Sequence, residues 1–383
     1  MRNHKSIAAA ILAGILIGGC GSGGGAAAPT TPGSPSVAAP AISTSTANGA
    51  QNGAFIVSLA STTAGAAIYY TVDGTTPTAS SQKFQAPFLV ASNLTVKAIA
   101  ATSSATSSVG SQSFTPNITS GTLVWSDEFA NTTGANAQPN PQIWTYDTGD
   151  SGFGNNELEN YCAWGSASAP CSASSPNAYV GTDGYLHIVA QQTTPGSYTV
   201  GSFTSARMKT QGLFSFQYGR IEFRAQVPEA HGFWPAAWLM GNNIATVNWP
   251  ACGEMDVLER VNAASSPDWN QGSVHGTGFT GSNLGETFNF PGGQNAAGWH
   301  TYGMIWKPGS VAYYVDNAAT PYATYTNPAS LNGLSGAAWP FDGGQSNFIL
   351  LNLAVGGSWP GSPNASTPFP AQMLVDYVRV YTN

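Results

Sequence analysis

Short alternations of apolar and polar residues run through most of the chain, and this period of two predicts strands. From residue 121 onward, the clearest of these stretches cover residues 185–190, 219–225, 311–316, 348–353 and 373–380. No helical periodicity of comparable length competes with them. Many strands separated by Gly, Pro and Asn turns are typical of a two-sheet antiparallel sandwich. We therefore expect an all-β jelly roll over residues 121–383.

A second, smaller β unit precedes this jelly roll. The same alternation, separated by turn signals, recurs in residues 54–59, 67–72 and 94–100. A small β-sandwich over residues 38–115 accounts for the pattern. Within it, the sequence YYTVDGTTPT at residues 69–78 resembles the small module found at the C-termini of chitobiases and hexosaminidases. That resemblance implies an accessory role, either binding sugar or spacing the jelly roll from the membrane.

The N-terminus has the pattern of an export signal. Arg2 and Lys5 precede an apolar run over residues 7–17 that is too short to span a bilayer. The run ends in a sequence that resembles the bacterial lipobox, which implies cleavage after residue 19 and a lipid on Cys20; an ordinary soluble secretion signal is the alternative. Residues 1–20 are thus the predicted signal peptide and residues 21–37 a Gly/Ser/Pro-rich linker. We expect a cell-envelope lipoprotein, at the outer membrane or cell surface, or an extracellular protein, touching the membrane only through its anchor.

Composition narrows the class of partner. Charged residues make up only 8% of the chain, and a net charge of −7 with 11 Lys and Arg leaves no basic patch for nucleic acid. Eleven Trp and 15 Tyr suit a protein that stacks flat rings on sugars. The expected partner is therefore a neutral polysaccharide, bound by a monomer.

Three cysteines remain in a compartment that permits disulfides. Cys162 and Cys171 are close enough in sequence to bridge around a short turn. Cys252 is then a small buried thiol. A cysteine nucleophile is the alternative for Cys252, but no histidine lies near it in sequence.

The densest chemistry lies in three carboxylates within six residues, Glu254, Asp256 and Glu259. In a regular strand Glu254 and Asp256 share one face, while Glu259 falls on the other. One extra residue in a β-bulge between Asp256 and Glu259 restores the phase, so the spacing predicts a bulge. Side chains leaning together could then reach the ~5.5 Å separation of retaining glycosidases, although geometry alone does not assign nucleophile and acid. A calcium cage or an acidic solvent face is the alternative.

These residues resemble the bulged active-site strand of glycoside hydrolase family 16, especially its laminarinase-like members. Further matching segments extend across residues 121–383: 123–129 (LVWSDEF), 154–159 (GNNELE), 207–210 (RMKT), 219–222 (GRIE), 232–240 (GFWPAAWLM) and 351–357 (LNLAVGG). The resemblance implies an open cleft and retaining, endo-acting hydrolysis of β-1,3-glucans, with Glu254 as nucleophile, Glu259 as acid/base and Asp256 between them. A mixed-linkage β-1,3-1,4-glucanase, or a family member acting on a galactan, is the alternative.

The same resemblance implies substrate-binding roles for Trp234 and Trp238, by stacking on glucose rings, and for Asn155, Arg207 and His275, by hydrogen bonding. Trp238 could instead belong to the core, because alternation alone does not fix its face. A non-catalytic sugar-binding jelly roll is the rival from another functional class.

A structural calcium ion is also implied by the resemblance. Its ligands would be Glu128, Asp376 and a backbone carbonyl near Gly184, since calcium prefers hard oxygen ligands. Catalysis itself is expected to need no cofactor.

Overall fold

The computed structural model describes residues 36–261, 268–281 and 283–383, and the regular secondary structure of these residues consists almost entirely of β-strands. Three short helical turns interrupt it: η1 (Gly152–Gly154), α1 (Ile244–Val247) and η2 (Ala329–Leu331). Within the described ranges, no helix has the length and apolar character needed to cross a membrane. The predicted export signal and Cys20 lie outside the described residues.

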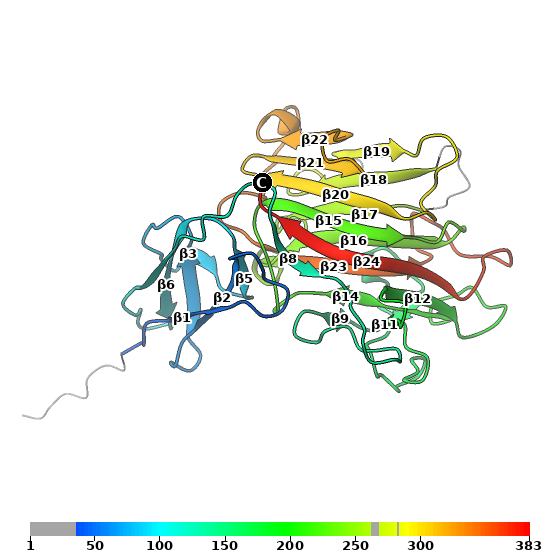
Figure 1. Cartoon of the computed structure of the whole chain (residues 1–383), viewed down its shortest axis with the longest axis horizontal. Coiled ribbons are helices and arrows are strands. Elements are labelled where there is room, and N and C mark those ends of the chain that lie inside the picture. The colour runs from blue at the N-terminus through cyan, green and yellow to red at the C-terminus, as the bar shows by residue number, and fades with distance from the viewer. Residues whose placement is uncertain (1–35, 262–267, 282) are drawn as a thin grey trace, which may run out of the picture. The chain divides into compact units, whose positions relative to one another are not determined.

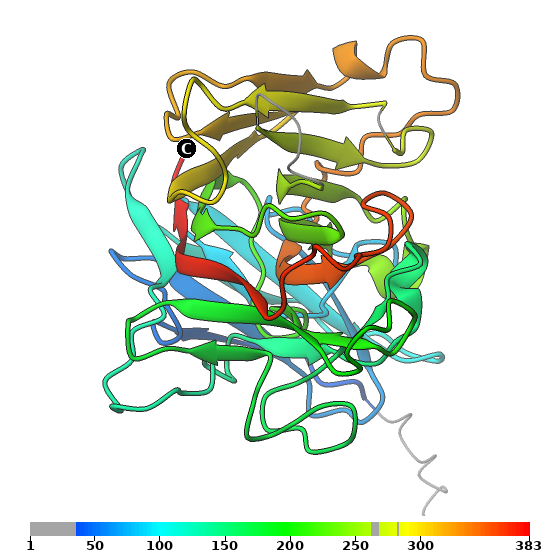
Figure 2. The ribbon, with the colours of Figure 1, turned by 90° about the vertical axis from the view of Figure 1, so that its right-hand side faces the viewer.

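The jelly roll consists of two large sheets, stacked as layers (Figures 1 and 2). Among the described residues, the first sheet has the order β10 (Glu159–Tyr161), β13 (Phe203–Ser205), β12 (Leu186–Gln192), β24 (Ala371–Tyr381), β15 (Gly219–Gln226), β20 (His300–Lys307), β21 (Ser310–Val315) and β22 (Ala323–Thr326), with β11 (Ala178–Val180) on β12 and β8 (Leu123–Asp127) on β24. The second sheet has the order β19 (Gly285–Asn289), β18 (Trp269–His275), β17 (Glu254–Glu259), β16 (Phe233–Gly241), β23 (Asn347–Val355), β14 (Arg207–Lys209) and β9 (Thr145–Asp147). All strand predictions from residue 121 onward are confirmed to within two residues at either end.

The smaller unit is the predicted sandwich. One of its sheets has the order β1 (Ala41–Ser45), β2 (Phe55–Ala60) and β5 (Phe88–Val90), and the other has the order β4 (Gln82–Lys83), β3 (Ala67–Thr71), β6 (Leu94–Ala101) and β7 (Gly110–Phe114). Val57, Tyr70 and Phe88 belong to its own buried cluster.

Trp125 of β8 links the two sandwiches. Its side chain is fully buried, its ring stacks on Phe214 at 4.2 Å, and its indole N–H donates to the carbonyl of Asn48 at 2.7 Å. Ala50 continues the contact through a backbone bridge to Trp125. The two sandwiches therefore share buried surface within one unit, residues 37–383.

Alternation within the second sheet separates core from cleft. Ala237 and Leu239 of β16 belong to the main core cluster, together with Leu351 of β23. Their neighbours Trp238 and Met240 belong to a second cluster on the opposite face. The cleft floor is therefore mostly apolar, and the polar side chains on it stand out as candidates for chemistry.

Candidate active site

A cleft of about 900 Å³ lies over the second sheet. It is lined by side chains from β14, β16, β17, β18 and β23 and by the loops that carry Asn155, Trp249 and Trp359. All five residues predicted to bind substrate line it, namely Asn155, Arg207, Trp234, Trp238 and His275. So do Glu254, Asp256 and Glu259.

The predicted bulge is present in β17. Asp256 pairs with Trp238 of β16 and Leu258 pairs with Ala237, so Val257 is the extra residue. Val257 and Leu258 are both buried in the main core cluster. Two successive apolar side chains thus face the core, and the strand returns to phase with Glu259 on the cleft side.

Gly253 fixes the start of this strand. Its φ of 82° lies in the left-handed region, and a Cβ built there would come within 2.8 Å of Pro340. Only glycine enters β17 at this point without strain. The backbone that presents Glu254 is therefore specified locally.

Indole N–H groups hold the two outer carboxylates. Trp249 Nε1 donates to Glu254 Oε2 at 2.8 Å, and Trp234 Nε1 donates to Glu259 Oε1 at 3.1 Å. Neutral donors of this kind fix a carboxyl group's position without adding a full positive charge beside it. Both glutamates are thus oriented, and no arginine or lysine in the described part of the chain forms an ion pair with them.

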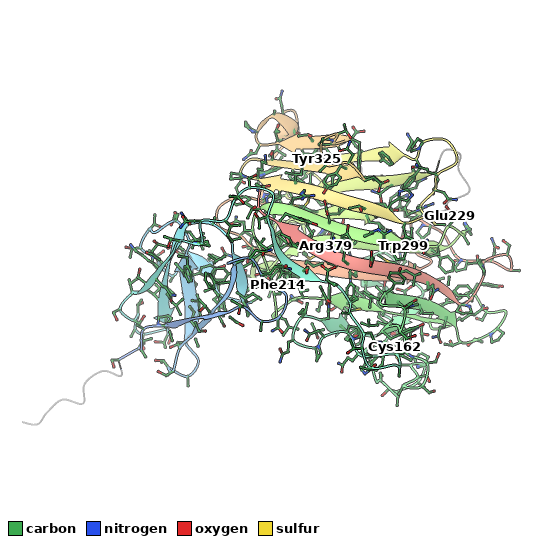
Figure 3. All side chains as sticks on the ribbon, viewed as in Figure 1. Cys162, Phe214, Glu229, Trp299, Tyr325 and Arg379 are labelled. Carbon is green, nitrogen blue, oxygen red and sulfur yellow. A yellow bond between two sulfur atoms is a disulfide. The ribbon has the colours of Figure 1, made fainter. Side chains whose placement is uncertain are left out.

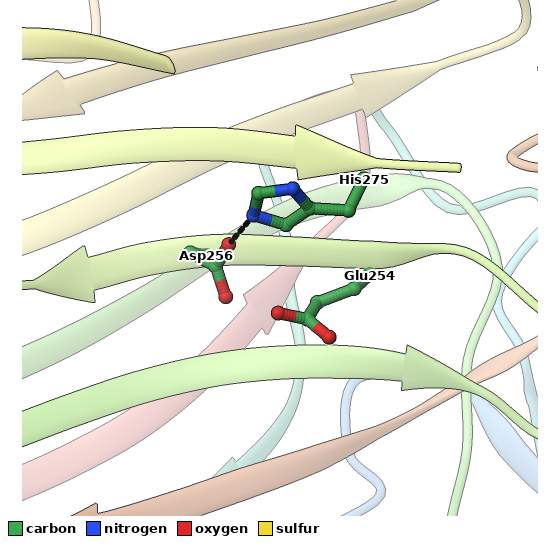
Figure 4. A group of neighbouring side chains, drawn as sticks. All are labelled: Glu254, Asp256 and His275. Atoms are coloured by element: carbon green, nitrogen blue, oxygen red, sulfur yellow. Dashed lines mark ion pairs between the residues drawn. The ribbon is translucent and has the colours of Figure 1, made fainter. Parts of the chain in front are cut away.

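Asp256 lies between them and contacts His275. Its Oδ2 atom is 3.0 Å from His275 Nε2, and Figure 4 shows Glu254 beside this pair. Ligand atoms of Glu254, Asp256 and His275 all lie within 4.8 Å of one another. Calcium takes six to eight oxygen ligands, so two carboxylates and an imidazole suit proton transfer better than a calcium cage.

Burial and mutual repulsion keep protons on this cluster. Burial, together with the charge of Asp256, raises the pKa of Glu254 to about 8. Burial raises the pKa of Asp256 to about 7, and a hydrogen bond with Glu254 opposes that rise. Burial and the charges of Asp256 and Glu254 raise the pKa of Glu259 well above its usual range. The site can therefore hold a protonated acid at Glu259 while Asp256 and Glu254 share a second proton.

Trp238 is largely buried, yet it forms part of the cleft floor. It is 7% exposed, its Nε1 donates to Asn352 Oδ1 at 2.8 Å, and the Arg207 guanidinium lies 4.8 Å from its ring centroid. Arg207 also pairs with Asp147 at 3.1 Å. Trp238 is thus better placed to hold Arg207 than to offer an open face to a sugar.

Two cleft tryptophans escaped the sequence analysis, Trp249 and Trp359. They are 49% and 40% exposed, high values for such large apolar side chains. Trp359 makes an edge contact with Trp234 at 5.5 Å and a tilted contact with Trp269 at 5.8 Å. Their proximity in sequence to Glu254 and to the segment 351–357 was the available signal.

The predicted calcium ligands are engaged with arginine. Both oxygens of the Glu128 carboxylate accept hydrogen bonds from Arg379, at 2.9 and 2.8 Å, on the sheet that contains β24 (Figure 3). Asp376 pairs with Arg224 at 2.5 Å. As they stand, these two side chains do not form a calcium cage, and calcium binding stays a prediction.

Cys162 and Cys171 form a disulfide, as expected from their spacing, and Figure 3 labels Cys162. Cys252 is a buried free thiol. Burial and the charge of Glu254 raise the pKa of this thiol to about 11, which leaves it protonated and unsuited to be a nucleophile.

Comparison with known proteins gives consistent matches. A model described as "Glycosyl hydrolases family 16" matches residues 171–379, and one described as "Chitobiase/beta-hexosaminidase C-terminal domain" matches residues 46–112. A beta-glucanase of Rhodothermus marinus is 35% identical over 68% of this chain and 84% of its own length. Glucan endo-1,3-beta-glucosidase A1 of Niallia circulans is 33% identical over 70% of this chain, which covers 38% of that longer protein. The solved laminarinase catalytic domain of Thermotoga maritima superposes with a TM-score of 0.58 at 35% identity, covering 69% of this chain and 99% of that domain.

Proposed function

Since the chain belongs to glycosyl hydrolase family 16, we propose that it hydrolyses internal β-1,3-glucosidic bonds of laminarin-type glucans with retention of configuration. The observation that carries this proposal is the bulged strand β17, which sets Glu254, Asp256 and Glu259 on the floor of one open, tryptophan-lined cleft. The similarity to a beta-glucanase and to laminarinase structures supports the choice of substrate.

Two carboxylates of different protonation are what a retaining mechanism requires. We assign Glu259 as the general acid, as the resemblance of its strand to the family's active-site strand implies; burial and the charges of Asp256 and Glu254 raise its pKa well above the usual range, which suits a carboxyl group that must donate a proton. It protonates the glycosidic oxygen while the Glu254 carboxylate attacks the anomeric carbon, so that the C–O bond to the leaving sugar breaks and a glycosyl ester forms. Glu259, now ionised, removes a proton from water, which attacks the same carbon and releases Glu254.

Asp256 makes the nucleophile available. Three crowded carboxyl groups cannot all be ionised, and Glu254 is the attacking anion whenever the proton that it shares with Asp256 sits on Asp256. His275 at 3.0 Å holds Asp256 in place. Trp249 keeps one Glu254 oxygen hydrogen-bonded and so restricts the rotation of this carboxyl group.

The direct test is the release of reducing ends from laminarin, lichenan, carboxymethylcellulose and agarose. The wild type, Glu254→Gln and Glu286→Gln are compared; Glu286 is an exposed residue of β19 outside the cleft and serves as a matched control. Hydrolysis of laminarin by the wild type and the control, but not by Glu254→Gln, would support the proposal. Lichenan as the better substrate would move the assignment to a mixed-linkage enzyme, and laminarin binding without any hydrolysis to a sugar-binding protein.

We also propose that the mature protein is exported and anchored through a lipid on Cys20. The proposal rests on the N-terminal pattern alone. Fractionation of cells that express the full chain tests it: the wild type is expected with the membranes, and Cys20→Ala in the soluble fraction. Equal partition of the two would indicate an ordinary secretion signal.

A further inference from the structure

Two buried carboxyl groups outside the catalytic strand have no role in the mechanism above. Glu157 and Glu159 are 3% and 0% exposed. They lie at the end of the loop that carries Asn155 and at the first residue of β10. Two ionised carboxylates buried together would be strongly unfavourable, so their hydrogen-bond partners must show how the charge is reduced.

Donors are present for three of the four oxygens. Glu157 Oε1 accepts from Asn155 Nδ2 at 3.1 Å, and Glu157 Oε2 accepts from the Tyr161 hydroxyl at 2.8 Å. Glu159 Oε2 accepts from the backbone N–H of Val355 at 2.7 Å. Glu159 Oε1 is buried and has no donor among the described residues. A proton on this oxygen, donated to Glu157, satisfies both groups.

We propose that Glu157 and Glu159 share one proton, and that the resulting singly charged pair positions the Asn155 side of the cleft. Glu159 supplies the neutral carboxyl group and Glu157 the anion. Glu157 lines the cleft beside Asn155, but Asn155 and Tyr161 occupy its two oxygens, so the pair acts by positioning these partners. This inference goes beyond the catalytic assignment, and its binding test rests on the proposed function.

A chain of hydrogen bonds leads from the pair to the cleft floor. Tyr161 donates to Glu157, which leaves its hydroxyl oxygen free to accept from Asn352 Nδ2 at 3.3 Å. The Asn352 side-chain oxygen Oδ1 in turn accepts from Trp238 Nε1 at 2.8 Å. The Glu157 anion thereby fixes the direction of the Tyr161 hydroxyl, whose oxygen is left to accept from Asn352, and it holds the Asn155 amide on its other side.

The surroundings favour one proton over none. Burial, followed by the charge of Glu157 and their hydrogen bond, raises the pKa of Glu159 well above its usual range. Arg207, a cation that acts electrostatically on Tyr161, is itself paired with Asp147 at 3.1 Å, and its guanidinium lies 5.0 Å from the Phe153 ring centroid. Tyr161 faces the pair as a neutral phenol, because burial and the two glutamates raise its own pKa.

The shared proton is tested without substrate, by following thermal unfolding against pH for the wild type and Glu159→Gln. Glutamine keeps an N–H donor toward Glu157 and an oxygen acceptor for Val355, but it does not titrate. In the wild type, the raised folded-state pKa gives stability that is full below the unfolded pKa of ~4.3 and is lost as pH rises toward the folded pKa. The stability of the variant relative to the wild type should therefore increase as pH rises across that window. The folding equilibrium constant should change by up to about tenfold per pH unit in favour of the variant. Parallel curves would overturn the shared proton.

Positioning is tested by laminari-oligosaccharide binding in the hydrolytically silent Glu254→Gln background. Adding Glu157→Gln should weaken binding about tenfold, the effect of removing a charged acceptor from two donors. At alkaline pH the pair loses its shared proton, and binding by the Glu254→Gln parent should weaken. Adding Glu159→Gln should leave the affinity unchanged at neutral pH and make this alkaline weakening smaller. Adding Glu286→Gln should change nothing. Unchanged affinity with Glu157→Gln would overturn the positioning role. If the Glu254→Gln parent binds no oligosaccharide at any pH, the substrate assignment fails instead, while the unfolding experiment still decides on the shared proton.

Discussion

Glu254→Gln should make the protein more stable at alkaline pH while abolishing hydrolysis. The catalytic carboxylates are crowded, with Glu254 and Asp256 oxygens within 4.8 Å of each other. At this upper limit of 4.8 Å two unit charges repel by about 3.5 kcal/mol at an effective dielectric constant of 20, and by about 0.9 kcal/mol at that of water. Glutamine has nearly the same shape and still accepts from Trp249. The substitution therefore removes the repulsion and leaves the contacts.

The sign of the pH dependence follows from the raised pKa values. Folded-state pKa values of about 8 for Glu254 and about 7 for Asp256 lie above the ordinary carboxyl range. Stability from these groups is complete below the unfolded values of ~4 and is lost as pH rises through the folded ones. The advantage of Glu254→Gln over the wild type should thus be near zero at pH ~4 and rise to about 1–3.5 kcal/mol by pH ~9. For a domain of this size that corresponds to roughly 3–10 °C in melting temperature.

The assay is thermal unfolding of the wild type, Glu254→Gln and the exposed control Glu286→Gln over that pH range. The control should follow the wild type throughout. A Glu254→Gln curve that also runs parallel to the wild type would refute the reasoning, because it would mean that the site carries no like-charge strain. A uniform gain at every pH would point to packing instead of charge.

Three further outcomes are expected. Glu259→Gln should lower kcat on laminarin by about 10²–10⁴-fold. The decrease in kcat should be smaller on an aryl glucoside, whose leaving group needs no proton. Trp249→Phe removes the indole donor that lowers the pKa of Glu254, so the acid limb of the kcat/KM profile should move to higher pH and kcat should fall about tenfold. Chelation with EGTA should leave the initial rate unchanged, because carboxylate catalysis needs no metal; a lower melting temperature at an unchanged rate would instead reveal a structural calcium ion.

The catalytic strand could be predicted from sequence because its information is local. The spacing of Glu254, Asp256 and Glu259 requires a phase shift, and the adjacent apolar residues Val257 and Leu258 supply it. Period-two alternation gave the strands for the same reason. Each inference depends only on which side of a strand a residue faces, and neighbouring residues decide that.

Contacts across the fold were not predictable in this way. Glu157 and Glu159 belong to segment 154–159, for which the sequence predicted no burial, yet tertiary packing buries both. Arg207 lines the cleft as expected, but its contact with Trp238 was not foreseen, because Trp238 lies on β16, two positions away from β14 in the sheet order. Glu128, expected to bind calcium, meets Arg379 from the opposite end of the domain sequence. Alternation specifies a face, whereas the partner on that face comes from a distant segment.

The chain uses two kinds of partner for its few carboxyl groups, and the choice follows what each must do. Glu128, which follows β8 of the first sheet, is paired with Arg379. Burial raises the pKa of Glu128, but the hydrogen bonds from the guanidinium bring this pKa below its usual value. In the cleft, Glu254 and Glu259 accept hydrogen bonds from neutral indole donors, and burial keeps their pKa values high. An arginine there would hold both groups ionised and leave no proton for the glycosidic oxygen. Neutral donors at these two hydrogen bonds are therefore as necessary for Glu259 to act as an acid as the bulge that places Glu259 in the cleft. Its consequence is that stability must fall with rising pH over the same range in which Glu259 loses its proton.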